Sequence, residues 1–387
     1  MWTALEPVGR DRRTGGYRRF AWTAEDATLR EWFAGEASAR GLDLTVDRAG
    51  NQWAWLGDPD SCGPGVVVGS HLDSVPDGGA YDGPLGVVSA FAALDALRDN
   101  GFDTTTPLAV VNFGDEEGAR FGVGRAGSRL ITGALPADRA RALTDAGGTS
   151  MAEAMGGTAA GLGRDDETLR RIGTFVELHV EQGRALVDQG AAIGVASAIR
   201  PHGRWRIELP GQANHAGTTG MAERHDAMIA LARVVLAARD AANRHGGVAT
   251  CGRVRVLPNG VNAIASHVTA SLDSRATTPE QVHAIVADIG VAVEAAGGEI
   301  VEESWTGATT FPAGLTDRLA GALHAPVLDT GAGHDAGILA AAGVPAAMIF
   351  VRNPTGVSHS PAEHAERADC LAGVTALATV LEDLAGP

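Results

Sequence analysis

The 387-residue sequence predicts an α/β protein in which a smaller domain is inserted into a larger one. Short apolar runs alternate with helical patterns over about the first 195 residues, which is typical of α/β folds. Between residues 201 and 311 the pattern changes, and the chain then returns to alternating helix and strand. We therefore expect a larger domain made of residues 1–200 and 312–387, and an inserted domain made of residues 201–311.

The first part of the larger domain alternates helices with apolar strands. Thr23 is the expected N-cap of a helix over residues 24–40, because its hydroxyl can accept a backbone N–H of the first turn. Apolar runs at 66–68 and 108–113 predict strands, with a helix over 86–98 between them. Strands that are continuously apolar indicate a sheet covered by helices on both faces.

The inserted segment has the order βαββαβ, which matches a ferredoxin-like unit. After it, residues 336–351 predict a buried helix followed by a buried strand, because Gly343 and Pro345 interrupt the apolar run. The expected elements of the inserted segment are strand 204–209, helix 225–239, strands 248–257 and 268–275, helix 279–296 and strand 299–305.

Charge and composition exclude several classes of function. The formal net charge is −16, which argues against nucleic acid or an anionic membrane as the main partner. All 31 basic residues are arginine, so Schiff-base and P-loop lysine chemistry are impossible in this chain. Cys62, Cys251 and Cys370 are too few and too far apart for a disulfide framework. The N-terminus has no signal-peptide pattern, and we expect a cytoplasmic protein.

Five short segments concentrate histidine, aspartate and glutamate at predicted strand ends or tight turns. Imidazole and carboxylate are ligands of zinc and similar divalent metals, and the absence of a cysteine ligand indicates a catalytic rather than a structural site. Each segment alone is more often structural or solvated, but the set is hard to explain by chance. The segments are 69–73, 81–83, 115–118, 177–183 and 358–363.

Three stretches of the chain are similar to motifs of one known enzyme family. Residues 69–76 read Gly-Ser-His-Leu-Asp-Ser-Val-Pro, 113–121 read Phe-Gly-Asp-Glu-Glu-Gly-Ala-Arg-Phe, and 177–183 read Glu-Leu-His-Val-Glu-Gln-Gly. They resemble the hydantoinase/carbamoylase family of amidohydrolases, which is related to the di-zinc aminoacylase and carboxypeptidase exopeptidases. The resemblance implies a two-metal, exopeptidase-like catalytic domain with an inserted dimerisation domain. It continues in order through residues 211–219, 259–262, 331–336 and 358–361.

The resemblance implies a binuclear centre, with two divalent ions per subunit that would be zinc, manganese, cobalt or nickel. Such ions supply Lewis acidity and lower the pKa of water. A histidine at position 179 favours the carbamoylase branch, because related peptidases tend to carry a carboxylate there. The implied ligands are His71 and His179 for one ion, Glu117 and His359 for the other, and Asp82 as the bridge between them.

Two acidic residues beside these ligands have implied roles of their own. Asp73, two residues after His71, would accept a hydrogen bond from its imidazole and orient it, although a simple turn residue is the alternative. Glu116 resembles the general base of the family. The sequence alone does not decide which member of the pair Glu116 and Glu117 is the ligand.

The resemblance also assigns residues that would bind the substrate. His215, Asn262 and Arg275 match substrate-binding positions in the inserted domain, and His215 would be catalytic as a donor to the oxyanion. Gln182 would line the same pocket, together with the turn at 331–334.

Arg275 is expected to hold the substrate carboxylate with two parallel hydrogen bonds. It follows Asn262 by 13 residues, and we expect both side chains to face one cleft. An ion pair between Arg275 and Asp273, which share one face of the strand, is the alternative.

These features together predict a metal-dependent amidohydrolase that cleaves the carbamoyl C–N bond of N-carbamoyl-L-amino acids or related ureido acids. The products would be the amino acid, carbon dioxide and ammonia. We expect a homodimer formed through the inserted domain. The alternatives are an allantoate amidohydrolase, an N-acyl amino acid deacylase or dipeptidase on the same scaffold, and a binding protein without catalysis.

Overall fold

A computed structural model describes residues 1–386 and divides them into two compact units. Unit 1 contains residues 1–198 and the chain from residue 310 onward, and unit 2 contains residues 199–309. Each unit has its own sheet and its own hydrophobic core. The mixed α/β class expected from the sequence is confirmed.

The sheet of unit 1 is built around parallel strands β3 (Gly65–His71), β4 (Leu108–Phe113), β5 (Ile172–Val180) and β13 (Ala346–Val351). Parallel strands place their carboxyl ends at one edge, where open α/β sheets carry their sites. The spatial order is β1-β2-β4-β3-β5-β13-β6-β11, with β12 paired to β6. The remaining strands are β1 (Asp43–Val46), β2 (Gln52–Leu56), β6 (Ile193–Ile199), β11 (Thr309–Thr310) and β12 (Val327–Thr330).

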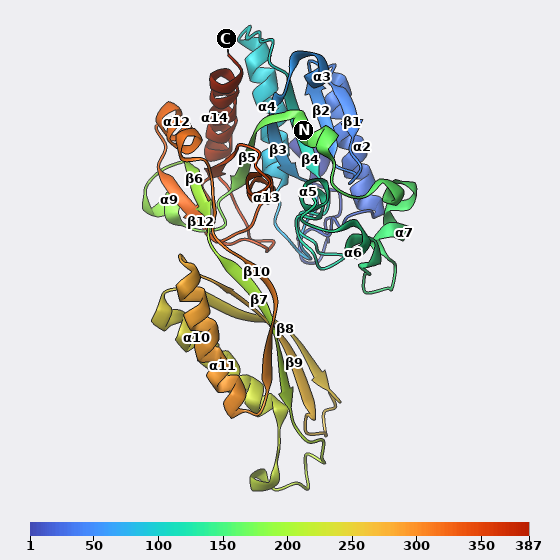
Figure 1. Cartoon of the computed structure of the whole chain (residues 1–387), viewed down its shortest axis with the longest axis vertical. Helices are drawn as coiled ribbons and strands as arrows, with labels where there is room; N and C mark the ends of the chain where they lie inside the picture. Colours follow the sequence, from blue (N-terminus) through green and yellow to red (C-terminus); the bar gives the residue numbers. More distant parts are fainter. Residues whose placement is uncertain (387) are drawn as a thin grey trace. The chain divides into compact units, whose positions relative to one another are not determined.

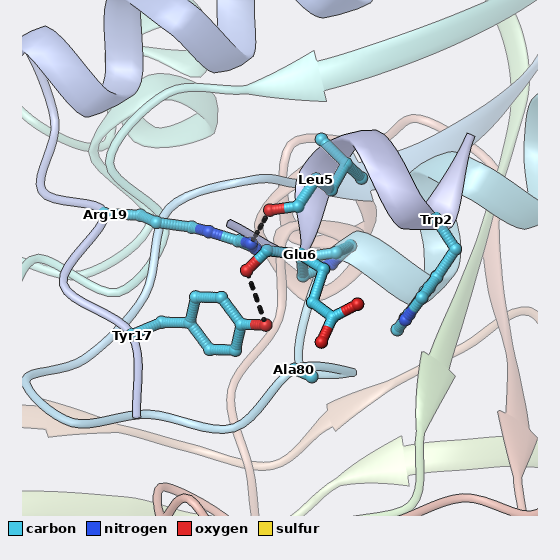
Figure 2. Close-up of a pocket in the computed structure, with 7 residues that line it drawn as sticks. Trp2, Leu5, Glu6, Tyr17, Arg19 and Ala80 are labelled. Atoms are coloured by element: carbon cyan, nitrogen blue, oxygen red, sulfur yellow. Dashed lines mark hydrogen bonds between the residues drawn. The ribbon is translucent and has the colours of Figure 1, made fainter. Parts of the chain in front are cut away.

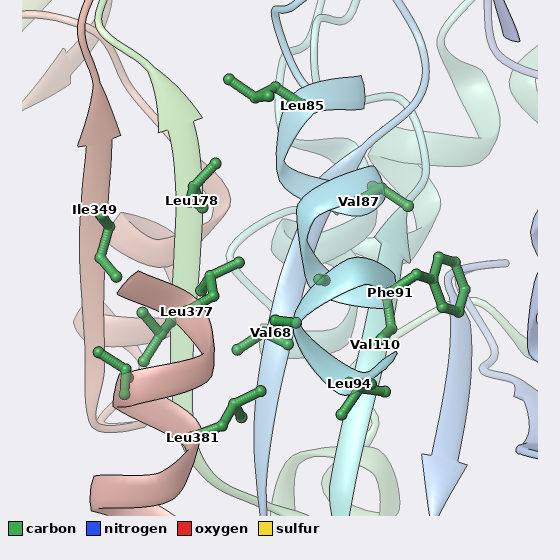
Figure 3. Packing of buried hydrophobic residues seen from close by; sticks show 14 of the residues in the cluster. Val68, Leu85, Val87, Phe91, Leu94, Val110, Leu178, Ile349, Leu377 and Leu381 are labelled. Carbon is green, nitrogen blue, oxygen red and sulfur yellow. The ribbon is translucent and has the colours of Figure 1, made fainter. Parts of the chain in front are cut away.

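Helices α4 (Pro84–Asp99) and α14 (Arg367–Ala385) cover one face of these strands (Figure 3). Their apolar side chains pack on alternate strand residues, among them Val68, Leu178 and Ile349. Successive strand residues face opposite sides, so His179 and Phe350 point away from these two helices. Helix α13 (Asp335–Ala341) packs on that opposite face of β5 and β13.

Helix α2 (Ala24–Ala39) begins where the sequence predicts. Thr23 has extended backbone, and its hydroxyl accepts the N–H of Asp26. This satisfies one of the donors that a helix start leaves free. The shorter helices of unit 1 are α1 (Trp2–Leu5), α3 (Pro59–Cys62), α5 (Ala126–Thr132), α6 (Ala137–Ala142), α7 (Met151–Met155), α8 (Asp166–Arg170), α9 (Ala185–Asp188) and α12 (Ala313–Leu323), with a 3₁₀ turn at Gly156–Gly161.

Unit 2 has the order βαββαβ, and its four strands form one antiparallel sheet in the order β10-β7-β9-β8. Along β9 every second residue is buried, because only one face of the sheet packs on the helices. The two helices contact each other and the sheet (Figure 1). The elements are β7 (His202–Pro210), α10 (Ala227–His245), β8 (Val248–Leu257), β9 (His267–Arg275), α11 (Pro279–Ala295) and β10 (Glu299–Thr306), with a 3₁₀ turn at Met221–Glu223.

The N-terminal segment is held by a buried arginine (Figure 2). The Arg19 guanidinium donates to the carbonyl oxygens of Leu5 at 2.7 Å and Val8 at 3.0 Å, and it stacks on the Tyr17 ring. Burial lowers the pKa of Arg19 to about 10. The backbone of Tyr17 also pairs with Gly78, so this segment supports the loop that follows β3.

Within residues 1–386, no helix combines the length and the apolar character needed to cross a membrane.

Candidate metal centre

Two buried histidines lie side by side at the carboxyl edge of the unit 1 sheet. His71 is the last residue of β3, and His179 is the last residue but one of β5. The strands pair in parallel with Gly69 opposite Glu177, which brings the two rings to the same level, with centroids 5.9 Å apart. Both side chains are only 1% exposed, so neither imidazole is a solvated surface group.

Asp82 joins these histidines to a second group of side chains. Its Oδ1 lies 3.0 Å from Nε2 of His179 and 3.5 Å from Nε2 of His71. Its Oδ2 lies 3.4 Å from Nε2 of His359, which is in turn 3.7 Å from Oε2 of Glu117. His71, Asp82 and His179 form one group of potential metal ligands, and Asp82, Glu117 and His359 form the other.

The donor atoms of both groups suit divalent ions. Nε2 of His71 and Oε1 of Glu117 are buried and have no hydrogen-bond partner among the described residues. Burial, with the negative charges of Asp82 and Glu116, raises the pKa of Glu117 well above its usual value. Buried imidazole and carboxylate donors that lack partners are stabilised by coordination to a cation. The five ligands proposed from the sequence therefore come together, with Asp82 shared.

A glycine and a glutamate hold Asp82 in place. Gly83 has φ +83°, and a Cβ there would lie 2.4 Å from Cε1 of His71, so backbone and space both require glycine. The carboxylate of Glu363 accepts the N–H of Asp82 at 2.9 Å and that of Tyr81 at 3.0 Å, and its other oxygen accepts the Ser358 hydroxyl. The sequence placed Glu363 in an acidic segment but gave no indication of this role.

Asp73 supports both sides of the centre. Nδ1 of His71 lies 3.2 Å from the carbonyl oxygen of Asp73 and 3.3 Å from its Oδ1. The same carboxylate accepts the N–H of Glu116 at 3.1 Å and the N–H of Glu117 at 3.0 Å. Asp73 is therefore more than a turn residue, because it ties the loop after β4 to the end of β3.

Glu116 is positioned as a proton acceptor beside the ligands. Its Oε2 lies 3.9 Å from Nε2 of His71, and the residue is 7% exposed. Burial raises the pKa of Glu116 to about 7, and the positive charges of His71 and Arg125 act against this rise. A carboxyl group with a pKa near neutrality is suited to general acid–base work.

Two further residues complete the inner part of the centre. His334 packs its ring against His179, with centroids 4.5 Å apart, and its Nε2 is buried without a hydrogen-bond partner. Gln182 donates from Nε2 to Oδ2 of Asp82 at 2.9 Å and to Ser358 at 3.2 Å. The amide of Gln182 is therefore directed at the shared carboxylate.

In unit 2, His215 and Asn262 lie on adjacent loops. His215 pairs with Ala263 in an isolated bridge, and the carbonyl oxygen of Asn262 accepts the N–H of Ala216 at 3.0 Å. Both His215 and Asn262 are exposed. Two polar side chains are thus presented together at one end of the unit 2 sheet.

Arg275 lies at the opposite end of strand β9 from these loops. The strand begins at His267, next to the Asn262 loop, and eight residues at the usual rise carry Arg275 about 26 Å away. Within one unit, Arg275 and Asn262 therefore do not face a single cleft, and that expectation is wrong. The alternative interaction is present, because Asp273 accepts from Nε of Arg275 at 2.7 Å and from Nη2 at 3.0 Å.

Comparison with known proteins gives a consistent result over the full chain. The family model described as Peptidase family M20/M25/M40 matches residues 67–383. The chain is 36% identical to an N-carbamoyl-L-amino acid amidohydrolase of Geobacillus stearothermophilus, over 97% of this chain and 96% of that protein. It is 34% identical to an allantoate amidohydrolase of Escherichia coli (strain K12), over 96% of this chain and 93% of that protein.

The fold is shared with solved amidases. A hydantoinase/carbamoylase family amidase from Burkholderia vietnamiensis matches with a TM-score of 0.90 and 28% identity, over all of this chain and 96% of that one. A second amidase of the same family, from Burkholderia ambifaria, matches with a TM-score of 0.80 and 32% identity, over all of this chain and 96% of that one.

Proposed function

The chain belongs to peptidase family M20/M25/M40, and we propose that it is an amidohydrolase. Its substrates would be N-carbamoyl-L-amino acids or closely related ureido acids, whose carbamoyl C–N bond it would hydrolyse. The products would be the amino acid, carbon dioxide and ammonia. The single observation that carries the proposal is the shared carboxylate of Asp82 between two groups of ligands, with Glu116 beside them.

The proposed metal content is two divalent ions per subunit, chosen from zinc, manganese, cobalt and nickel. His71 and His179 would hold one ion and Glu117 and His359 the other, with Asp82 between them. When bound, such ions supply Lewis acidity and make water a stronger acid. Nε2 of His71 and Oε1 of Glu117, which are buried without a hydrogen-bond partner among the described residues, support this metal content.

The residues around the ligands would handle the proton and the substrate. Glu116 would take the proton from the attacking water and return it to the leaving nitrogen, for which a pKa near 7 is suitable. His215 would donate to the oxyanion, while Asn262 and Gln182 would contact the substrate. Arg275 would hold the substrate carboxylate. To do so it would release the carboxylate of Asp273 and form its two hydrogen bonds with the substrate instead.

The separation of Arg275 from His215 and Asn262 supports a homodimer in which the two groups serve different active sites. If one subunit supplies Arg275 to a site, the partner would supply His215 and Asn262. The outer strands of the unit 2 sheet, β8 and β10, each have one unpaired edge within the described chain, which pairing between subunits would cover. We propose that this homodimer acts in the cytoplasm.

The closest alternatives use the same scaffold on other amides. Allantoate is itself a ureido acid, and one relative carries that name. An N-acyl amino acid deacylase or a dipeptidase would use the same scaffold and the same base, but the histidine at position 179 disfavours both, because related peptidases tend to carry a carboxylate there. A binding protein without catalysis is disfavoured because the proposed ligands and Glu116 are all present and brought together.

The decisive experiment is a metal reconstitution combined with a substrate panel. Protein stripped of metal would be reloaded with manganese, zinc, cobalt or nickel and assayed against N-carbamoyl amino acids, allantoate, N-acetyl amino acids and dipeptides. We expect no activity before reloading and preferred turnover of ureido acids afterwards. Full activity in the stripped protein, or preferred turnover of N-acetyl amino acids or dipeptides, would contradict the proposal.

A further inference from the structure

A partly buried arginine, Arg125, lies beside the proposed base and has no part in the function described above. Its backbone N–H donates to the carbonyl oxygen of Glu116, and the N–H of Ala126 donates to Asp115 at 2.9 Å. The chain after the loop at 118–124 therefore runs back along the segment that carries Glu116. This pairing fixes the Cα of Arg125 opposite the base.

The backbone of Arg125 adopts a conformation that arginine rarely takes. Its φ is +60°, in the left-handed region where the Cβ of any residue but glycine is crowded. Such conformations persist only where the surrounding structure imposes them, and they gather at functional sites.

The guanidinium occupies the space that a side chain at position 333 would fill. A Cβ on Gly333 would lie 1.7 Å from Nη1 of Arg125 and 2.8 Å from its Cζ, and the three nearest atoms all belong to this arginine. Gly333 is not in the left-handed region, so space rather than backbone conformation requires glycine there. The guanidinium consequently lies next to His334, whose ring packs on His179.

The guanidinium has no partner within the described chain. Among residues 1–386 its nitrogens take part in no hydrogen bond and no ion pair. It carries five N–H donors, and removing a charged group from water without a partner is unfavourable. Burial raises the pKa of Glu116, and the positive charge of Arg125 acts to lower it. The guanidinium is therefore close enough to interact electrostatically with the proposed base.

We propose that Arg125 binds a second carboxylate of the substrate, which makes the enzyme selective for ureido acids that carry two carboxylates. The proposal rests on the function proposed above, in which Arg275 holds the first carboxylate. A planar guanidinium matches a carboxylate with two parallel hydrogen bonds and gains most where water is partly excluded. The chemical class is a carbamoylated acidic amino acid, such as N-carbamoyl-L-aspartate.

The test compares two substrates of the same shape, N-carbamoyl-L-aspartate and N-carbamoyl-L-asparagine, on the metal-loaded enzyme. We expect kcat/KM to favour the aspartate substrate roughly 10–100-fold, as for a hydrogen bond between charged groups. Arg125→Met should reduce this ratio to near one. Arg139→Met is the matched control, because Arg139 also lacks a partner among the described residues but is exposed on α6, and it should keep the wild-type ratio.

A second variant moves the guanidinium without removing its charge. Gly333→Ala would place a methyl group where Nη1 of Arg125 now lies, and it should reduce the ratio as Arg125→Met does. In the double variant the substitution at 333 should add no further loss of selectivity, because the displaced group is already absent. Additive losses would contradict the proposal.

The outcomes separate this proposal from the proposed function. Turnover of both substrates with no preference for aspartate, or a preference that survives Arg125→Met, overturns the role of Arg125 and leaves the function intact. Turnover of other ureido acids but of neither of these two also overturns the role of Arg125. If no ureido acid of the panel is turned over, the proposed function fails. The role of Arg125 is then decided by calorimetric binding of succinate to metal-loaded protein. Arg125→Met should weaken that binding at least 10-fold, and equal binding would overturn the proposal.

Discussion

The carboxylate of Asp73 accepts the backbone N–H of Glu116 at 3.1 Å, which ties the proposed base to the end of the strand that carries the proposed metal ligand His71. The other oxygen of Asp73 accepts the N–H of Glu117 at 3.0 Å. One buried side chain therefore sets the position of His71, of Glu116 and of Glu117 at once. Groups that hold metal ligands in this way affect metal affinity as well as activity.

Asp73→Asn is expected to lower metal affinity about 10–100-fold, because an amide can accept only one of the two N–H bonds that the carboxylate now accepts. Metal titration of the stripped protein measures this directly. Asp77→Asn makes the same chemical change at a partly exposed turn residue paired with Arg18, and it should bind metal normally. Equal metal affinity in both variants would show that Asp73 is not a positioning residue.

Glu116→Gln should retain both ions and lose activity by about 10²–10⁴-fold, since it removes the base and no ligand. Glu117→Gln should instead lower the metal content, because Glu117 belongs to the group with Asp82 and His359. Metal analysis and kcat measured on the same samples separate the two roles. A reversed pattern would mean that the base and the ligand have been exchanged.

Mixing inactive His215→Ala protein with inactive Glu116→Gln protein should restore activity if each site takes His215 from the partner subunit. A heterodimer then has one intact site, so random exchange should recover about a quarter of the wild-type rate. Subunit exchange would be confirmed with differently tagged proteins. No recovery after exchange would place His215 and Glu116 in sites of the same subunit.

Arg275→Lys should raise KM for N-carbamoyl amino acids and cost about 2–4 kcal/mol in kcat/KM, because lysine cannot form the two parallel hydrogen bonds. Wild type should discriminate strongly against a carbamoylated amine without a carboxylate, and the variant should do so much less. Arg204→Lys is the control, since Arg204 lies 3.5 Å from the same Asp273 and is about half exposed. Equal discrimination in all three proteins would assign Arg275 to the ion pair alone.

Glu208 is expected to stabilise unit 2 in a pH-dependent manner. Burial opposes its ionisation, but hydrogen bonds from Thr269, His267 and Arg206 outweigh it and lower the pKa of Glu208 to about 2. The stabilisation is present above the usual glutamate pKa and is lost as pH falls through the lowered value. The side chain of Glu208 is partly exposed and solvent screens its interactions, so we expect only about 1 kcal/mol.

Urea unfolding of wild type and Glu208→Gln between pH 7 and pH 2 measures this contribution. The difference in unfolding free energy should be constant near neutrality and shrink as the pH falls towards 2. Glu302→Gln, at an exposed position on β10, should show no such trend. A difference between wild type and Glu208→Gln that is independent of pH would show that packing rather than charge is responsible.

Several helices and strands of unit 1, and the segments that carry the proposed site residues, could be predicted from the sequence alone. Helix α2 with its Thr23 cap follows from contacts between residues a few positions apart. The buried strand β4 could be predicted from its continuous apolar run, because such a run is typical of a strand covered on both faces. The motifs after the strands gave His71 and His179 because parallel strands end at one edge of a sheet.

Contacts between side chains that are distant along the chain could not be predicted from the sequence. Glu363 accepts a hydrogen bond from the N–H of Asp82, and the guanidinium of Arg125 lies against Gly333. Both contacts join segments far apart in the chain, and no local sequence pattern encodes them. The spacing of Arg275 from Asn262 suggested proximity, but an extended strand rises about 3.3 Å per residue and carries them apart. The distance in space between two residues cannot be inferred from their separation along the chain unless the strand direction and the path of the loops are known. Packing of the whole domain sets both.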